Sequence, residues 1–203
     1  MKALVFITAI LFYCSAFSQI SENDPFQEIL KFQMELTKQF KDTTESPLPN
    51  EEIENFTGHV FFPVDLKYRV EAKFVKTPDA QVFEMPTTTT RKPLYKQYAI
   101  AAFNIDSVEY HLALYQSQSL LEKEEYKDYL FLPFKDHTNG FETYGGGRYI
   151  DLRIPSGDTI IIDFNQSYNP YCAYSLRYSC PIPPDKNSIE TRIEAGIRFE
   201  EHE

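Results

Sequence analysis

Hydrophobic positions near the start of the chain recur with helical spacing. Four apolar residues lie three or four positions apart, namely Ile29, Phe32, Leu36 and Phe40. This spacing places side chains on one face of an α-helix. Asp24 followed by Pro25 is typical of an N-cap with proline at the first helical position. The pattern predicts one amphipathic helix over residues 25–41, whose apolar face seals one side of a domain.

From about residue 60 onward, short runs of apolar and β-branched residues alternate with Pro, Asn, Asp and Gly. This pattern is typical of an antiparallel sheet. We expect strands over residues 68–75, 81–85, 98–105, 108–115, 149–154 and 159–164. Hairpin turns are expected at residues 104–107 and 155–158. The fold class is therefore α+β and mainly antiparallel: a strand-rich domain, with a sandwich or barrel-like sheet, on which the N-terminal amphipathic helix packs.

Two further stretches predict short local structure. Residues 51–56 are expected to form one helical turn, and residues 120–128, charged and free of Gly and Pro, a short surface helix. Four threonines at residues 87–90 precede Arg91 and Lys92. We interpret this tract as a solvated loop, with a hydroxyl-lined ligand lip as the alternative.

The first residues predict export. The apolar run over residues 3–13 is too short to cross a bilayer and is typical of a signal peptide. Ala16 and Ser18 suit the −3 and −1 positions of a cleavage site after Ser18. A lipoprotein signal ending at Cys14 is the less favoured alternative, because bulky residues precede that cysteine. We expect a protein that is periplasmic or secreted.

The length and charge limit the classes of partner. Residues 19–203 suffice for a single domain with a core of its own. The formal net charge is −10, and an acidic protein repels phosphate backbones and anionic lipid. We therefore expect no nucleic-acid partner, and no membrane span once residues 1–18 are removed. No motif points to a cofactor, and the oligomeric state is left open.

The cysteine count becomes even after signal cleavage. Cys14 leaves with the signal peptide, so Cys172 and Cys180 remain. In an oxidising compartment two cysteines this close in sequence are most simply a disulfide. On the chain-entropy model such a short loop contributes about 2.5 kcal/mol of stability.

Glycine is concentrated between residues 140 and 147, which hold four of the seven glycines of the chain. A tight loop or bulge that leads into the following strand is the favoured interpretation. The alternative is a nest of backbone amides that binds an anion, with Arg148 as the counter-charge. The ligand-binding candidates of the whole region are Tyr144, Gly145, Gly146, Gly147, Arg148, Asp163, Asn165 and Asn169.

A hairpin around Ser156 would pair residues 149–154 with 159–164 and set Arg148 opposite Asn165. Because side chains alternate between the faces of a strand, Asp163 would then share a face with both of them. Such a cluster is either a structural ion pair or the mouth of a pocket, and both interpretations stay open.

Three classes of function follow. The first is a module that binds a small polar or anionic ligand. The alternative is a hydrolase that uses paired carboxylates, for which Glu142, Asp151 and Asp163 are the catalytic candidates. The third is a structural surface domain. Nucleophile-elbow, zinc-protease and kinase motifs are absent from the sequence.

The last third of the chain carries motifs that resemble a known family. They are Asp163-Phe164-Asn165, Asn169-Pro170-Tyr171-Cys172-Ala173, the Cys-Pro-Ile-Pro-Pro run over residues 180–184, and the glycine-rich run over residues 138–149. Together they resemble the uncharacterised bacterial domain-of-unknown-function family 1684 over most of the chain that follows the predicted signal peptide, and more weakly before Phe56. The resemblance implies a shared fold and no known activity.

The same resemblance bears on the cysteines. If relatives without export signals keep the cysteine pair, a metal site or a redox couple is an alternative to the structural disulfide. The spacing is unlike the paired Cys-x-x-Cys of zinc sites, and no histidine lies near in sequence. A Cys-x-x-Cys redox motif is also absent. A structural disulfide stays the favoured interpretation, and no metal is expected.

Overall fold

The computed structural model describes residues 24–199, so the predicted signal peptide lies outside the described residues and stays a prediction. The N-terminal helix α1 spans Pro25–Lys41, as expected. The Asp24 carboxylate caps it by accepting a hydrogen bond of 3.0 Å from the Phe26 N–H. Ile29, Leu36 and Phe40 form its buried face. No helix within residues 24–199 is long and apolar enough to span a membrane.

The remaining regular elements follow the predicted strand pattern. The second helix, α2, is short and spans Asn50–Ile53. The strands are β1 Arg69–Lys76, β2 Val82–Glu84, β3 Leu94–Ile105, β4 Val108–Ser117, β5 Tyr129–Asp136, β6 Arg148–Arg153, β7 Thr159–Asp163 and β8 Ser188–Ile189. Their order is β6-β5-β4-β3-β1-β7, with β2 paired to β3 and β8 to β5. All pairs are antiparallel except β5 with β8, which confirms a mainly antiparallel α+β fold.

Two strands, β5 and the short β8, were not predicted, and one predicted helix is wrong. Strand β5 is buried on both faces from Leu130 to Phe134, so its sequence is a continuous apolar run with a proline inside and lacks alternation. The surface helix expected over residues 120–128 is instead two 3-10 turns, Leu120–Glu122 and Glu124–Tyr126. These turns lead into β5.

Of the two predicted hairpin turns, the one at residues 104–107 is confirmed and the one at residues 155–158 is wrong. Asp106 and Ser107 both have positive φ, of 49° and 67°, and join β3 to β4 as a hairpin. The hairpin around Ser156 is wrong, because β6 pairs with β5 and β7 pairs with β1. Residues 154–158 therefore connect the two opposite ends of the strand order.

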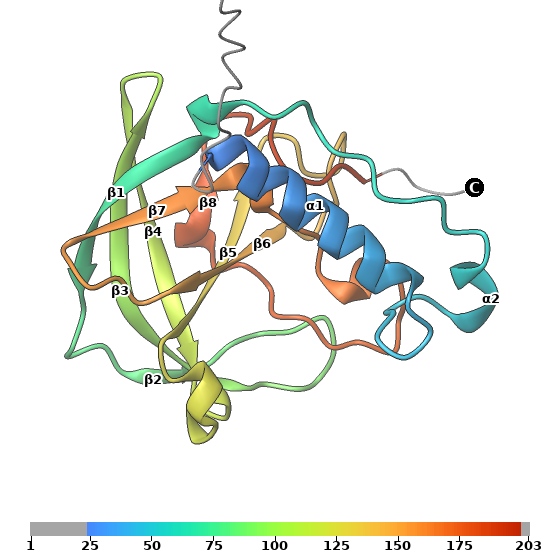
Figure 1. The fold of residues 1–203 in the computed structure, drawn as a ribbon. Coiled ribbons are helices and arrows are strands. Elements are labelled where there is room, and N and C mark those ends of the chain that lie inside the picture. The colour runs from blue at the N-terminus through green and yellow to red at the C-terminus, as the bar shows by residue number, and fades with distance from the viewer. Residues whose placement is uncertain (1–23, 200–203) are drawn as a thin grey trace, which may run out of the picture.

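This connection requires the sheet to curl. Six strands at about 4.8 Å spacing would span about 24 Å if the sheet were flat. The stretch from Arg153 to Thr159 reaches about 20 Å when fully extended. The sheet bends into a half-barrel that brings β6 and β7 near each other, and α1 lies alongside the part that contains β5 and β6 (Figure 1).

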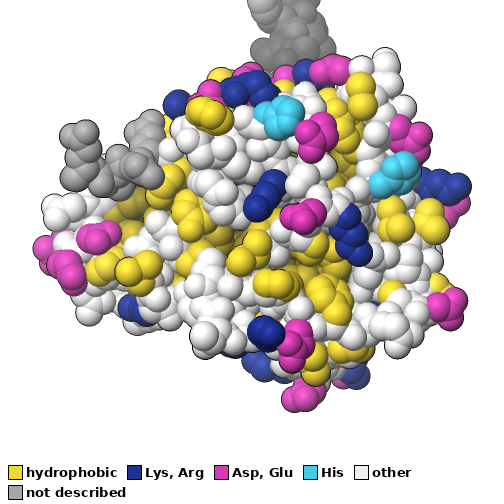
Figure 2. Space-filling view, turned by 180° about the vertical axis from the view of Figure 1, so that it is seen from behind, with side chains coloured by type: hydrophobic (Ala, Val, Ile, Leu, Met, Phe, Trp, Pro, Cys, Tyr) yellow, Lys and Arg dark blue, Asp and Glu magenta, His cyan; other side chains and the backbone are white. Residues whose placement is uncertain are grey.

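The two faces of the curled sheet bury different side chains. Aliphatic residues and phenylalanines fill the main core, among them Leu112, Leu130, Leu132 and Ile162. The opposite face of β3 to β6 carries mostly aromatic side chains, including Tyr95, Tyr115, Phe131 and Tyr149. On the surface seen from behind, hydrophobic side chains gather near the middle, and charged side chains of both signs surround them (Figure 2).

A half-buried histidine lies where α1 meets the segment after α2. The His59 ring packs edge-on against Phe40, with ring centroids 4.2 Å apart, and against Phe56 at 4.9 Å. Its Nε2 atom is buried and has no hydrogen-bond partner within the described residues. Burial lowers the pKa of His59 from 6.5 to about 4.

Folding stability should therefore fall as the pH drops from about 6.5 to 4, since over this window the unfolded chain binds a proton at His59 that the folded protein does not. The loss attributable to His59 should be about 2–3 kcal/mol. His59→Phe keeps an aromatic ring there and should flatten the curve by that amount. Urea unfolding at several pH values measures both proteins, and equal slopes would contradict the assignment.

Candidate ligand-binding pocket

A cavity of about 440 Å³ lies between α1, the aromatic face of the sheet and the segment after β7. Its size is within the usual range for small-molecule sites. Helix α1 contributes Phe32, Leu36 and Gln39 to its wall. The remaining lining residues come from strands and loops: Tyr95, Leu120, Tyr129, Phe131, Tyr149, Asp151, Tyr168, Pro170, Tyr171, Tyr178, Ser179, Cys180 and Pro181.

The alternation of β6 decides which of its side chains reach this cavity. Arg148, Ile150 and Leu152 point to the main core. Tyr149 and Asp151 point the other way and line the cavity. A shift of one residue in register would exchange the two sets.

Asp151 is held in place by two tyrosines. The hydroxyls of Tyr129 and Tyr168 both donate to its Oδ1 atom, at 2.6 and 2.7 Å. Its Oδ2 atom makes no hydrogen bond with the described residues. The side chain is exposed to the cavity, yet protein atoms surround it on the other sides, and this burial raises the pKa of Asp151.

Asp151 is the only charged residue among those that line the cavity within residues 24–199. Around it are eight aromatic side chains from α1, the sheet and the segment after β7. A carboxylate in an aromatic enclosure attracts a cationic or hydrogen-bond-donating group, and the ring faces add cation–π attraction.

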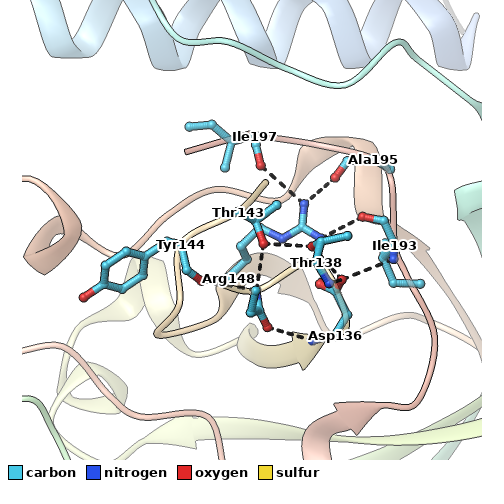
Figure 3. Close-up of polar contacts among 9 residues, drawn as sticks. Asp136, Thr138, Thr143, Tyr144, Arg148, Ile193, Ala195 and Ile197 are labelled. Carbon is cyan, nitrogen blue, oxygen red and sulfur yellow. Dashed lines mark hydrogen bonds and ion pairs between the residues drawn. The ribbon is translucent and has the colours of Figure 1, made fainter. Parts of the chain in front are cut away.

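The predicted cluster of Arg148 with Asp163 and Asn165 is wrong. Arg148 has no exposed surface and forms an ion pair with Asp136 at 2.8 Å. Its guanidinium also donates to backbone oxygens of Ala195 and Ile193, the latter at 2.9 Å, and Figure 3 shows this enclosure. The paired strands differ from the predicted ones, so Arg148 lies opposite Phe134 instead of Asn165.

Asp163 and Asn165 do lie together, at the end of β7. The Asn165 amide donates to Asp163 Oδ1 at 2.9 Å and also bonds to the backbone of Asp65. Asp163 lies 3.9 Å from Arg69. Further along the chain, Asn169 donates to the Tyr174 hydroxyl at 2.9 Å. These polar side chains are buried and hold loops together, and a ligand role for them stays a prediction.

The glycine loop forms a second cavity of about 560 Å³. Tyr144, Gly145 and Gly146 line it, together with Glu142, Arg198 and neighbouring residues. Gly147 lies outside its lining and has a positive φ of 92°. A Cβ atom there would lie 2.6 Å from the Phe134 carbonyl oxygen, so the residue must be glycine for backbone reasons.

The three carboxylates predicted as hydrolase candidates lie in separate environments. Glu142 pairs with Arg192 at 2.6 Å, Asp163 is bound by Asn165, and Asp151 lies in the aromatic pocket. Within residues 24–199, no hydrogen bond joins any two of them. Residues 24–199 also hold no group of three His, Cys, Asp or Glu side chains arranged to bind a metal ion.

The threonine tract is not a free loop. Thr87 forms a β-bridge with Pro181, and the Thr88 N–H donates to the Cys180 carbonyl at 2.9 Å. The Arg91 guanidinium donates to the Ser179 carbonyl at 2.7 Å. The tract therefore supports the segment that carries Cys180.

The structure has Cys172 and Cys180 as neighbouring thiols. The backbone N–H of Cys172 donates to the Cys180 sulfur at 3.1 Å. The predicted disulfide between them is not shown by this geometry and stays a proposal.

Sequence reasoning named Asp151 only as a weak catalytic candidate and missed the tyrosines around it. Tyr129 and Phe131 belong to β5, which was not predicted, so the sequence could not show which face of the sheet carries them. The 14 tyrosines of the chain were the available signal, since a buried tyrosine hydroxyl usually finds a hydrogen-bond partner.

Comparisons with known proteins identify the family. The chain belongs to the family described as protein of unknown function DUF1684, whose model matches residues 54–198. A solution NMR structure of an uncharacterised protein from Haloarcula marismortui is 33% identical and has a TM-score of 0.67. The match covers 86% of this chain and 94% of that one. Among curated proteins, none matches. Except for the α1 residues, the pocket lining falls within the matched residues.

Removing the buried Arg148 side chain should lower the free energy of unfolding. Arg148→Met leaves the Asp136 carboxylate without its cation, and we expect a loss of about 3–5 kcal/mol of unfolding free energy in urea titrations. Asp136→Asn should cost less in the Arg148→Met background than in the wild type, because the two charges are coupled.

Arg153→Met provides the matched control on the same strand. Arg153 pairs with Asp128 in an exposed position, and its loss should change stability by no more than about 0.5 kcal/mol. If both arginine variants lost the same free energy of unfolding, burial of the Arg148–Asp136 pair would not explain its contribution to stability.

Proposed function

We propose that this protein is a small-ligand binding module, and that its ligand joins an aromatic or apolar body to a cationic nitrogen. The observation that carries the proposal is the single carboxylate of Asp151, oriented by two tyrosine hydroxyls inside an aromatic cavity. Oriented polar groups inside a mainly apolar cavity are the usual features of a small-molecule site.

The charge of the ligand follows from the lining. An anionic ligand was the alternative suggested by the glycine loop and Arg148. In the aromatic cavity, however, an anion would face the negative carboxylate of Asp151, and no Lys or Arg among residues 24–199 lines the cavity. Arg148 is enclosed by the core and does not reach the cavity. A protonated amine would bond to Asp151 Oδ2, while Tyr129 and Tyr168 keep Oδ1 occupied.

The other two functions have less support. A hydrolase with paired carboxylates needs a second acid in reach of the first, and Asp151 has none among the residues that line its cavity. A purely structural domain would not need an exposed carboxylate inside an aromatic enclosure. Export through residues 1–18 is also a proposal, supported by the apolar run and the small residues before Gln19.

Three probes that share a phenyl ring and differ in charge test the proposal: benzylammonium, benzyl alcohol and benzoate. We expect affinity to decrease in that order. At ten times its Kd, benzylammonium should raise Tm by about 3–5 °C. Benzoate binding more tightly than benzylammonium would contradict the charge preference, and no Tm rise with any of the three would contradict the binding function.

Asp151→Asn keeps the shape of the side chain and removes its charge. It should weaken benzylammonium binding by about tenfold or more, measured by calorimetry. Asp106→Asn, at an exposed turn position with positive φ, is the matched control and should bind like the wild type.

Binding of benzylammonium should also depend on pH. The ligand pairs with the ionised carboxylate, so affinity should rise as the pH increases through the pKa of Asp151, which burial raises above 3.8. In Asp151→Asn this dependence should disappear. The same pH profile in both proteins would show that another group controls binding.

A further inference from the structure

The two cysteines differ sharply in their surroundings. Cys172 is half-buried and lies in the 3-10 turn Tyr171–Ala173, whereas Cys180 is buried and contributes to the wall of the aromatic pocket. The Cys172 N–H donates to the Cys180 sulfur at 3.1 Å, so the two residues are in direct contact. Cys172 is therefore the more exposed thiol of the pair.

Hydrogen bonding from the Cys180 thiol and from the hydroxyls of Thr88 and Tyr144 lowers the pKa of Cys172. The Thr88 hydroxyl is positioned by accepting the Cys180 N–H at 3.2 Å. Tyr144 is held by its edge-on contact with Phe199, at 5.3 Å between ring centroids. Donors of this kind stabilise a thiolate, which is the reactive form of cysteine.

The acid–base properties of the pair follow this geometry. Hydrogen bonds, first from Cys180, lower the pKa of Cys172 from 9.0 to about 6. The hydrogen bond to Cys172 and burial raise the pKa of Cys180. One thiol is thus activated at neutral pH while its neighbour keeps its proton.

We propose that Cys172 and Cys180 form a redox-active dithiol, in which Cys172 attacks small-molecule disulfides and Cys180 resolves the mixed disulfide. This role is distinct from a permanent structural cross-link. It does not depend on the ligand proposed for the aromatic pocket.

The exchange has two balanced steps. The Cys172 thiolate attacks one sulfur of a disulfide R–S–S–R, the S–S bond breaks, and one thiolate leaves and takes up a proton. Cys180 then loses its proton, and its sulfur attacks that of Cys172 and displaces the second thiolate, which is also protonated. Two electrons pass from the cysteines to the small-molecule disulfide, while one proton comes from Cys180 and the other from the solvent that took it up when the Cys172 thiol ionised.

The two cysteines relate to different cavities. Cys180 belongs to the wall of the aromatic pocket. Cys172 lines neither cavity, but it interacts with Tyr144, which lines the second cavity with Gly145 and Gly146.

Equilibration with glutathione tests the couple. The reduced protein is incubated in buffers of varied glutathione disulfide to glutathione ratio, quenched with acid and labelled with a maleimide for mass spectrometry. We expect a graded change from two free thiols to none. Two thiols that stay free at every ratio, or a bond that stays closed in fully reducing buffer, would each overturn the proposal, the second because a structural disulfide resists glutathione.

Single variants separate the two roles. Cys180→Ser should accumulate one glutathione adduct at Cys172, because the resolving thiol is missing. Cys172→Ser should form an adduct at Cys180 at least about tenfold more slowly. Equal adduct rates in the two variants would contradict the assignment of roles.

A labelling profile in the wild type supplies an independent readout. Iodoacetamide should modify Cys172 before Cys180, with an apparent pKa near 6 instead of the ordinary value near 9. In denaturant the two cysteines should react alike, which provides the control for peptide detection. A profile with the ordinary pKa at Cys172 would overturn its role as the attacking thiol.

Discussion

The ion pair between Arg148 and Asp136 is the contact on which the C-terminal half of the fold depends. It joins the first residue of β6 to the last residue of β5, and the guanidinium donates to backbone oxygens of Ile193 and Ala195. Asp136 also accepts from the Ile193 N–H. A buried charge is tolerated only when its partners are complete, so this pair fixes where the chain after β8 crosses the core.

The same strand positions the pocket. Because Arg148 is fixed on the core face, alternation places Tyr149 and Asp151 on the opposite face, where α1 and the segment after β7 enclose them. The charge of Asp151 is then offset by two tyrosine donors and by no cation in the pocket lining among residues 24–199. The structural arginine and the exposed carboxylate are thus consequences of one strand register.

Local sequence signals predicted the local structure well and the long-range pairing poorly. Helix α1 follows from its N-cap and spacing, and the turn at Asp106 from residues that tolerate positive φ. Strand β5 was missed because burial on both faces removes alternation. The error at β6 and β7 concerns long-range pairing: a short linker with Gly157 favours a hairpin, but β6 pairs with β5 and β7 with β1, at opposite ends of the strand order. Asp151 could be named from sequence, but its tyrosine neighbours depend on that pairing.

The placement of the cysteines adds a constraint on how the two proposed sites relate. Cys180 is part of the pocket wall, and its backbone is paired with the threonine tract through Thr88. A movement of the Cys180 sulfur toward Cys172 would therefore displace a residue of the pocket wall whose backbone is bonded to the threonine tract. If oxidation changes ligand affinity by some factor, linkage requires the ligand to change the dithiol equilibrium by the same factor. Because Thr88 bonds to Cys180 through both its N–H and its hydroxyl, a shift of Cys180 would reach the threonine tract at this residue.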